Sequence, residues 1–322
     1  MVKIDRKDRE ILYQLDLNSR QSFAKIGKQV GLPKTVVAYR INKLKDANII
    51  KTFYTVIDAF KLGYTSLRIY LVFQYTTEDI ENEIIQYFSQ NKLNWWTISA
   101  EGRFDLAVIM WVKNINDFYA FWEKTLRKYR DYFQEQQFSA YIQAYNFRNT
   151  YLLGETNKTE RIKMQITAGG KPVKTDDLDF QILKILGPNA RMPIREIAST
   201  LNTTVSIVNY RINKLVNQGV IQGFRTDIDL FKLGYQFFKA DIYLRDYQKR
   251  GNIINYVRTN PYLVRIDRSI GISDLELEFH VKSINHFHDI MHELINKYRE
   301  SIKNYKYVYA SKLHNMNYLP EV

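Results

Sequence analysis

The chain has 322 residues, 45% of them hydrophobic and 25% charged, which are the proportions of a globular protein long enough for several domains. Its formal net charge of +13 favours a polyanionic partner such as nucleic acid. The absence of cysteine excludes disulfides, thiolate nucleophiles and cysteine-bound metals. The charged N-terminus and the lack of a long apolar run predict a cytoplasmic protein that does not enter a membrane.

The sequence is a tandem duplication. YRINKLKDANIIKTFYTVIDAFKLGY at 39–64 matches YRINKLVNQGVIQGFRTDIDLFKLGY at 210–235 without a gap, an offset of 210 − 39 = 171 residues. Farther along, VKNINDF at 112–118 matches VKSINHF at 281–287 after a slip of two residues. The duplication predicts two equivalent units, joined by a polar linker at 154–174.

The first part of each copy is helical in its periodicity. Asp5 is the predicted N-cap of a helix with an apolar stripe, and Asp8 lies in its first turn. A second helix is expected over 23–30, and a break at 31–33 precedes a third helix that runs to about Lys45. Three short helices with a tight turn predict helix-turn-helix domains at 1–64 and 175–235.

The second part of each copy changes to the period of strands. In the first copy, strands are expected at 66–74, 95–100, 104–112 and 133–145, and helices at 77–91 and 114–129. This βαββαβ order is ferredoxin-like, and the second copy repeats it. The predicted fold class is therefore α+β, with βαββαβ domains at 65–153 and 236–322.

The third helix of each copy has a polar face suited to the DNA major groove. Val37, Ile41 and Leu44 form its core stripe, and the face one step round carries amide, hydroxyl and basic groups that can bond base edges and phosphates. A merely solvated surface is the alternative. The predicted contact residues are Lys34, Thr35, Ala38, Tyr39, Asn42 and Lys43 in the first copy and Ser206, Asn209, Tyr210, Asn213 and Lys214 in the second.

The two helix-turn-helix domains differ in charge. Residues 1–64 hold 13 Lys and Arg against 6 Asp and Glu, a net +7, whereas residues 172–235 hold 8 against 6, a net +2. The first domain is expected to bind DNA more strongly, and the second either reads bases with less electrostatic help or acts as a spacer. Four arginines, Arg20, Arg40, Arg191 and Arg211, either contact phosphate or pair within the protein, and the sequence does not choose.

Taken together, these motifs resemble the Lrp/AsnC ("feast/famine") regulators. The resemblance rests on Asp-x-x-Asp before the first helix, Asn-Ser/Ala-Arg before the second, Arg-Ile-x-x-Leu in the third, and a Gly-x-x-Asp turn in the βαββαβ domain. It covers nearly the whole chain, twice, although family members commonly carry one copy. It implies transcription regulation by double-stranded DNA binding and a sensor domain that dimerises sheet to sheet and binds an amino acid.

The resemblance places the candidate effector site at the Gly-x-x-Asp turns. Glu101 and Arg103 could bind the two ends of a zwitterion, whereas the second copy has isoleucines at these positions. The alternative is structural: glycine supplies a positive φ in the hairpin and aspartate caps it. The residues concerned are Glu101, Gly102, Arg103, Asp105, Gly271 and Asp274.

The strand FDLAVIMWV at 104–112 is apolar on both alternations, with Phe104, Leu106, Val108 and Met110 on one face and Ile109 and Trp111 on the other. A sheet of this kind must bury its second face. The expected partner is another sensor sheet, either within the chain or in a homodimer, with the 101–105 turn near the edge of the pair. The four tryptophans are expected to be sheet-face and interface residues.

Other functions are less well supported. His288 and His292 have a metal-binding i, i+4 spacing, but HDIMH lacks the glutamate of HExxH, and surface histidines explain the pair. The siroheme decarboxylases resemble this family in fold and would need His and Arg around a tetrapyrrole, yet the first copy has no histidine. An RNA-binding protein is a further alternative, although the aromatic-glycine motif is missing. We therefore predict a non-enzyme without catalytic residues, cofactor or metal.

Overall fold

The computed structural model describes residues 4–154, 163–167 and 171–320. Each copy begins with three helices, as expected, and a capping box opens the first of them, formed by Asp5 with Asp8 and by Asp176 with Asp179. The helices are α1 (Arg6–Leu17), α2 (Phe23–Val30) and α3 (Lys34–Asp46) in the first copy, and α6 (Asp177–Leu186), α7 (Ile194–Thr200) and α8 (Val205–Asn217) in the second.

A four-stranded antiparallel sheet with two helices follows in each copy. Both sheets have the ferredoxin-like strand order, β5-β2-β4-β3 and β11-β8-β10-β9, which confirms the predicted fold class. The first unit is β2 (Thr65–Phe73), α4 (Glu78–Ser89), β3 (Asn94–Gly102), β4 (Leu106–Val112), α5 (Ile115–Tyr129) and β5 (Phe133–Phe147). The second is β8 (Gln236–Leu244), α9 (Arg250–Val257), β9 (Leu263–Ile270), β10 (Leu275–Val281), α10 (Ile284–Lys297) and β11 (Ile302–Met316).

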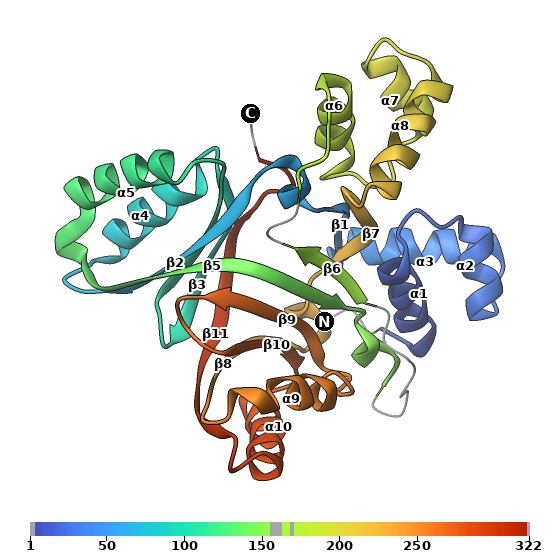
Figure 1. The fold of residues 1–322 in the computed structure, drawn as a ribbon. Helices are drawn as coiled ribbons and strands as arrows, with labels where there is room; N and C mark the ends of the chain where they lie inside the picture. The colour runs from blue at the N-terminus through green and yellow to red at the C-terminus, as the bar shows by residue number, and fades with distance from the viewer. Residues whose placement is uncertain (1–3, 155–162, 168–170, 321–322) are drawn as a thin grey trace.

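The two sheets join at both edges, so that their eight strands close into a ring. The long strands β5 and β11 make the closure possible, because the first half of each pairs within its own sheet and the second half with the other copy, β5 with β9 and β11 with β3. Helices α4 and α5 cover one outer flank of the ring, and α9 and α10 cover another (Figure 1). The two βαββαβ sheets therefore pair within the chain.

Ring closure buries both faces of the sheets. All seven residues of β4 are buried: Leu106, Val108 and Met110 pack under α4 and α5, while Ala107 and Ile109 belong to clusters on the other side. Phe104 lies with the latter group and not with Leu106, because the strand begins only after it. The expectation of a second buried face is confirmed.

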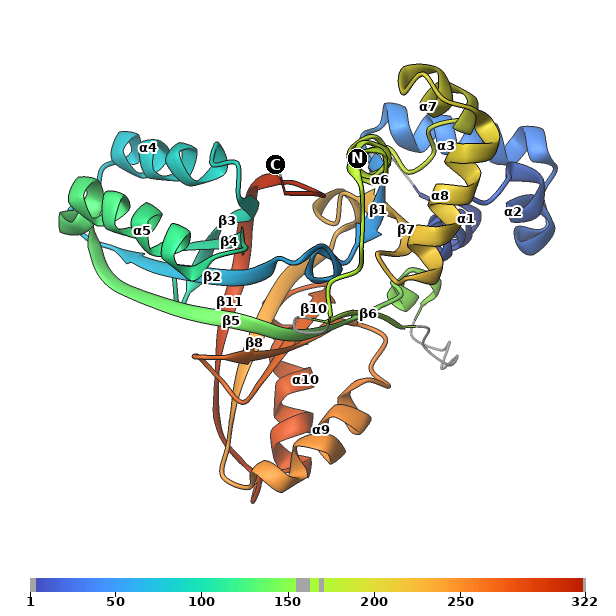
Figure 2. The ribbon, with the colours of Figure 1, turned by 45° about the horizontal axis from the view of Figure 1, so that its top comes forward.

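Two strands of the helix-turn-helix modules were not foreseen in the sequence. Strand β1 (Ile50–Ile57) follows α3, strand β7 (Ile221–Ile228) follows α8, and they pair with each other in a two-stranded ribbon beside the helices (Figure 2). We call this pair the ribbon. Tyr54 pairs with Arg225, its equivalent in the other copy, so an approximate two-fold axis passes between them.

Part of the predicted linker forms a strand. Residues Lys163–Thr167 form strand β6, which extends the sheet from β5, so this part of the linker is not irregular as expected. Its neighbours at 155–162 and 168–170 lie outside the described residues. None of the described helices is long and apolar enough to cross a bilayer.

Candidate functional site

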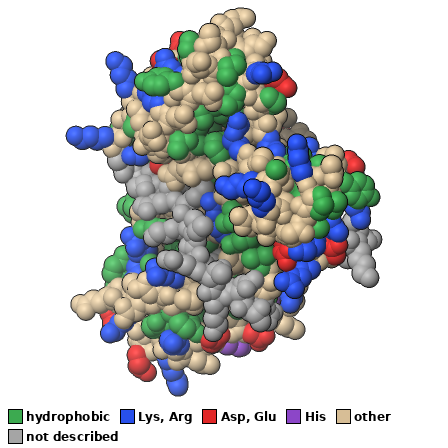
Figure 3. Space-filling model, turned by 90° about the vertical axis from the view of Figure 1, so that its right-hand side faces the viewer, with side chains coloured by type: hydrophobic (Ala, Val, Ile, Leu, Met, Phe, Trp, Pro, Cys, Tyr) green, Lys and Arg blue, Asp and Glu red, His purple; other side chains and the backbone are tan. Residues whose placement is uncertain are grey.

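Helix α3 buries its predicted core stripe and exposes its polar face. Lys34, Thr35, Asn42 and Lys43 are exposed, Ala38 is half-buried, and 69% of Tyr39 is accessible. In α8 the equivalent tyrosine is 66% accessible, Lys214 is half-buried, and the other predicted contact residues, Ser206, Asn209 and Asn213, are exposed. Lys and Arg side chains project from this side of the molecule (Figure 3). Both helices thus present an exposed polar face with a tyrosine side chain at its centre.

The arginines on the flanks of these helices pair within the protein. Arg40 donates to Asp5 at 2.7 Å and to Asp8 at 2.8 Å. The equivalent Arg211 donates to Asp176 at 2.6 Å and to Asp179 at 3.2 Å. They therefore fix the third helix of each module against the start of the first. Of the two alternatives left open by the sequence, internal pairing is the one observed.

The lysines of the two helices are not equivalent. Lys214 forms an ion pair with the buried Asp179 at 3.0 Å, whereas Lys43, at the same position in the first copy, has no ion pair within the described part of the chain. The difference in available positive charge between the two surfaces is therefore larger than the sequence count alone indicates.

Arg20 and Arg191 hold the two modules together. Arg20 donates to the carbonyl of Ala190, and Arg191 donates to that of Ser19, so equivalent residues exchange equivalent hydrogen bonds. Each guanidinium also lies over an aromatic ring of the ribbon, 5.4 Å from its centroid. These arginines are interface residues, and the reciprocity relates the modules by the same approximate two-fold axis as the ribbon.

One contact between the first module and the ribbon is not repeated by the equivalent residues of the other copy. Asp16 of α1 is fully buried and accepts hydrogen bonds from Arg225 Nε at 2.7 Å and from the backbone N–H of Asn149 at 2.8 Å. The Arg148 guanidinium donates to the Asp16 carbonyl at 2.6 Å. The equivalent of Asp16 in the second copy is Gly187. The cluster joins the first module to the ribbon and to the end of β5.

The Gly-x-x-Asp turns lie at the seams between the two sheets. Gly102 and Gly271 have φ of +107° and +125°, values that disfavour side chains. Asp105 accepts a hydrogen bond from the backbone N–H of Phe73, the last residue of β2, at 2.7 Å. Asp274 accepts one from the backbone N–H of Leu244, the last residue of β8, at 2.8 Å. These are the contacts expected of the structural alternative.

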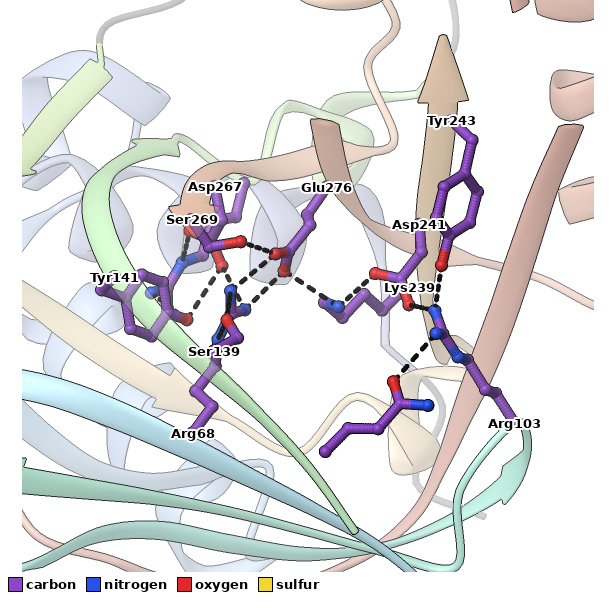
Figure 4. Close-up of polar contacts among 12 residues, drawn as sticks. Arg68, Arg103, Ser139, Tyr141, Lys239, Asp241, Tyr243, Asp267, Ser269 and Glu276 are labelled. Atoms are coloured by element: carbon purple, nitrogen blue, oxygen red, sulfur yellow. Dashed lines mark hydrogen bonds and ion pairs between the residues drawn. The ribbon is translucent and has the colours of Figure 1, made fainter. Parts of the chain in front are cut away.

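Glu101 and Arg103 do not face a common space. Arg103 points into the ring, where it donates to Asp241 at 3.0 Å, to the Tyr243 hydroxyl at 2.6 Å and to Gln137 at 3.0 Å (Figure 4). Glu101 is exposed. The guanidinium thus links the two copies, and an effector at this turn remains a prediction.

The ring encloses a network of charges that sequence reasoning did not find. Arg68 of β2 is 2% exposed and donates to Glu276 of β10 at 2.6 Å and to the Ser139 hydroxyl at 2.8 Å. Lys239 of β8 bridges Glu276 and Asp241 (Figure 4). Burial alone would raise the pKa of Glu276, but Arg68 and Lys239 hold it well below its ordinary value.

A cavity of about 280 Å³ lies between the ribbon and one end of the ring. Ribbon residues including Tyr54 and Thr226 form one wall. Aromatic residues of the first sheet, Trp95 and Trp96, contribute to another. Neither the sequence periodicity nor the duplication indicated this cavity, because it exists only where the two copies meet.

Two titratable groups on β10 line the cavity. Burial raises the pKa of Glu278 to about 7, although the nearby Arg265 opposes this rise. Burial lowers the pKa of His280 to about 3, so its imidazole is neutral near pH 7. His280 Nδ1 lies 3.0 Å from the Tyr151 hydroxyl, whereas the Glu278 carboxylate has no hydrogen bond or ion pair among the described residues.

Glu278→Gln is expected to stabilise the protein at pH 8 by about 1–3 kcal/mol and to have little effect at pH 5. The unfolded chain ionises this group near pH 4.5 and the folded chain only near 7, so stability falls as the pH rises through that window. The amide cannot ionise and removes the loss. Urea unfolding midpoints of both proteins at the two pH values measure the effect. The exposed Glu101→Gln is the control, and an equal gain at both pH values would contradict the account.

The tryptophans and the pair of histidines singled out in the sequence can also be placed in the structure. Trp95 stacks on Trp111 with centroids 5.4 Å apart, and Trp96 contacts Phe237 of the second copy at 6.1 Å, as expected of sheet-face and interface residues. The rings of His288 and His292 lie 6.3 Å apart. Over the described ranges, no three His, Asp or Glu side chains gather as metal ligands.

Comparison with known proteins gives consistent matches. The AsnC-type helix-turn-helix domain model matches residues 4–45, and a winged helix-turn-helix DNA-binding model matches 175–222. An HTH-type transcriptional regulator of Pyrococcus abyssi is 31% identical over 129 residues, which are 40% of this chain and 87% of the relative. The HTH-type transcriptional regulator LrpB of Bacillus subtilis is 26% identical over 124 residues, 38% of this chain and 80% of LrpB. Each match thus spans less than half of this chain.

Solved structures of a siroheme decarboxylase match the chain over both copies. The siroheme decarboxylase NirDL superposes with a TM-score of 0.64 over 98% of this chain and 94% of that chain, at 12% sequence identity. At that identity the likeness shows a common fold and nothing about the reaction.

Proposed function

This chain belongs to the Lrp/AsnC family of DNA-binding transcriptional regulators, and we propose that it acts in the cytoplasm as a covalently linked pseudo-dimer that reads DNA with α3 and α8. One observation carries the proposal: the reciprocal contacts of Arg20 and Arg191 relate two modules that each expose a polar third helix. Two-fold related helix-turn-helix modules place their recognition helices in successive major grooves. The fused chain provides such a pair without a second subunit.

The two helices are proposed to read related but different half-sites. Both keep Tyr and Asn at equivalent positions, which supports a shared feature in the two half-sites. They differ where α3 has Ala38 and α8 has Asn209, and where α3 has Lys34 and α8 has Val205. Asn can bond an adenine edge, Ala suits a thymine methyl, and Lys prefers guanine or phosphate. An imperfect palindrome is therefore the expected operator.

Selection of bound sequences from random duplex DNA tests the proposal. We expect two non-identical half-sites with centres about 10 base pairs apart, and an affinity that falls at least tenfold between low and moderate salt. Single-stranded RNA as competitor separates DNA recognition from general polyanion binding and tests the RNA-binding alternative. Absence of a shifted duplex at low salt, or enrichment of one half-site alone, would count against the pseudo-dimer.

The tetrapyrrole alternative has the full-length fold likeness in its favour, and His280, Arg225 and Arg265 line the cavity. However, Arg225 is held by Asp16, and Arg265 Nε donates to the buried Asp267 at 2.7 Å. A cavity of about 280 Å³ is also small for a macrocycle. We therefore propose that the chain is not a decarboxylase. Stoichiometric binding of an iron porphyrin, with no affinity for duplex DNA, would reverse this conclusion.

A further inference from the structure

We propose that the cavity between the ribbon and the ring binds a small organic cation, an amine with an apolar or aromatic body, and that Glu278 holds its charged group. The site is separate from the Gly-x-x-Asp turns and from the faces of α3 and α8. Four observations support it: an unpartnered buried carboxylate, a second unpartnered buried group, the paired state of the wall's arginines, and the aromatic lining.

The first observation is the lack of a partner for Glu278. Glu276, Glu278 and His280 alternate along β10 and belong to its inner face, since the intervening residues pack under α9 and α10. Glu276 is bound by Arg68 and Lys239, and His280 contacts the Tyr151 hydroxyl. Glu278 is 8% exposed and has no hydrogen bond or ion pair in the described chain. A buried carboxylate without a donor is costly, so a donor from outside would be bound strongly.

The second observation comes from the opposite wall. Thr226 of β7 is 4% exposed, and its hydroxyl has no hydrogen-bond partner among the residues that the structure describes, although it lines the cavity. The carboxylate of the adjacent Asp227 also lines it, and burial raises the pKa of this group. Two carboxylates and a hydroxyl thus offer mainly acceptors to a bound molecule.

The charge of the ligand follows from the cations of the same walls. Arg225 and Arg265 are already neutralised by the buried Asp16 and Asp267, and the exposed Lys51, which also lines the cavity, forms an ion pair with Asp229 at 3.7 Å. A ligand carboxylate would have to compete with these partners, whereas a ligand ammonium would meet acceptors that have none. The complementary ligand is therefore a cation and not an anion or a zwitterion.

The remaining lining selects the body of the ligand. Trp95, Trp96, Ile98, Phe237 and Leu313 supply aromatic and aliphatic surface. Indole faces attract organic cations as well as apolar groups. The volume of about 280 Å³ lies near the lower end of ligand pockets, which suits a molecule with a single ring or a short branched chain.

The position of the cavity couples it to the helix-turn-helix modules, a step that rests on the proposed DNA-binding function. One wall is the ribbon, whose strands lead directly from α3 and α8, and the other is the ring. A ligand that contacts both favours one placement of the modules relative to the ring, and with it one spacing of the two reading helices.

Calorimetry on the full chain, without DNA, tests the site with matched molecules. Tryptamine, tryptophan and indole-3-propionate share one body, and isopentylamine, leucine and 4-methylpentanoate share another. The amine of at least one set is expected to bind, its amino acid more weakly, and its acid not measurably. Glu278→Gln should weaken amine binding roughly 10- to 100-fold, and Thr226→Val by less, while Glu101→Gln should leave it unchanged.

Several results would overturn the assignment. These are no binding by any amine at millimolar concentration, tighter binding of an amino acid than of its amine, and an affinity unaffected by Glu278→Gln. Loss of binding with Glu101→Gln instead would move the site to the turn. Shift assays on selected DNA, with and without the amine, separately test the coupling. A protein that binds no DNA refutes the proposed function, while the calorimetry still decides the site.

Discussion

Replacing Arg68 with Met is expected to lower the free energy of unfolding by about 3–5 kcal/mol, because the change leaves Glu276 buried without its main counter-charge. Arg68 is 2% exposed and joins β2 of the first copy to β10 of the second across the ring. The effect should appear in urea unfolding followed by tryptophan fluorescence, since all four tryptophans lie in the first sheet unit.

A double variant separates lost packing from uncompensated charge. Arg68→Met with Glu276→Met removes both partners and should be closer in stability to the original protein than either single variant is. An exposed ion pair provides the control. Arg127 and Glu123 lie 2.9 Å apart on the surface, and Arg127→Met should lower the free energy of unfolding by less than about 1 kcal/mol. Additive losses in the double variant would show that the two charges do not stabilise each other.

Replacing Lys34, Asn42 and Lys43 together with Ala is expected to weaken operator binding on the order of 100-fold. The change removes one candidate base contact and two cations without an ion pair among the described residues. It should also reduce the slope of log affinity against log salt by about 2, one for each lysine that contacts phosphate. Fluorescence anisotropy at several salt concentrations measures both quantities.

The matched variant replaces Asn209, Asn213 and Lys214 with Ala. We expect roughly a tenfold loss and almost no change in salt slope, because Lys214 is already paired with Asp179. Helix content should be unchanged in both variants, since every replaced side chain lies outside the core. Equal losses from the two variants would refute the asymmetry between the modules while leaving DNA binding intact.

The fusion of two copies permits contacts that a homodimer could not form. Asp16 binds Arg225, but the equivalent positions hold Gly187 and Tyr54. Tyr54 and Arg225 pair across the approximate two-fold axis, so a homodimer with arginine at this position would place two like charges side by side. With one chain, each copy can contribute a different half of the ion pair.

The sequence by itself determined the duplication, the helix-turn-helix modules and the βαββαβ order. These features depend on local periodicity, caps and turns, which a chain carries over short distances. The predicted N-cap at Asp5 and the predicted core stripe of α3 agree with the structure for that reason. The apolar character of β4 on both faces also indicated that the sheet must bury its second side.

Only the tertiary structure decided how that second side is covered. The alternating LELEFHV of β10 has the pattern of a strand with one wet face, yet Glu276 and Glu278 are buried inside the ring. Periodicity tells which residues share a face, but it cannot tell whether that face meets water. Here pairing between strands more than a hundred residues apart excludes water, so the charge network, the partners of Arg103 and the cavity at Glu278 all arise from contacts between the two copies.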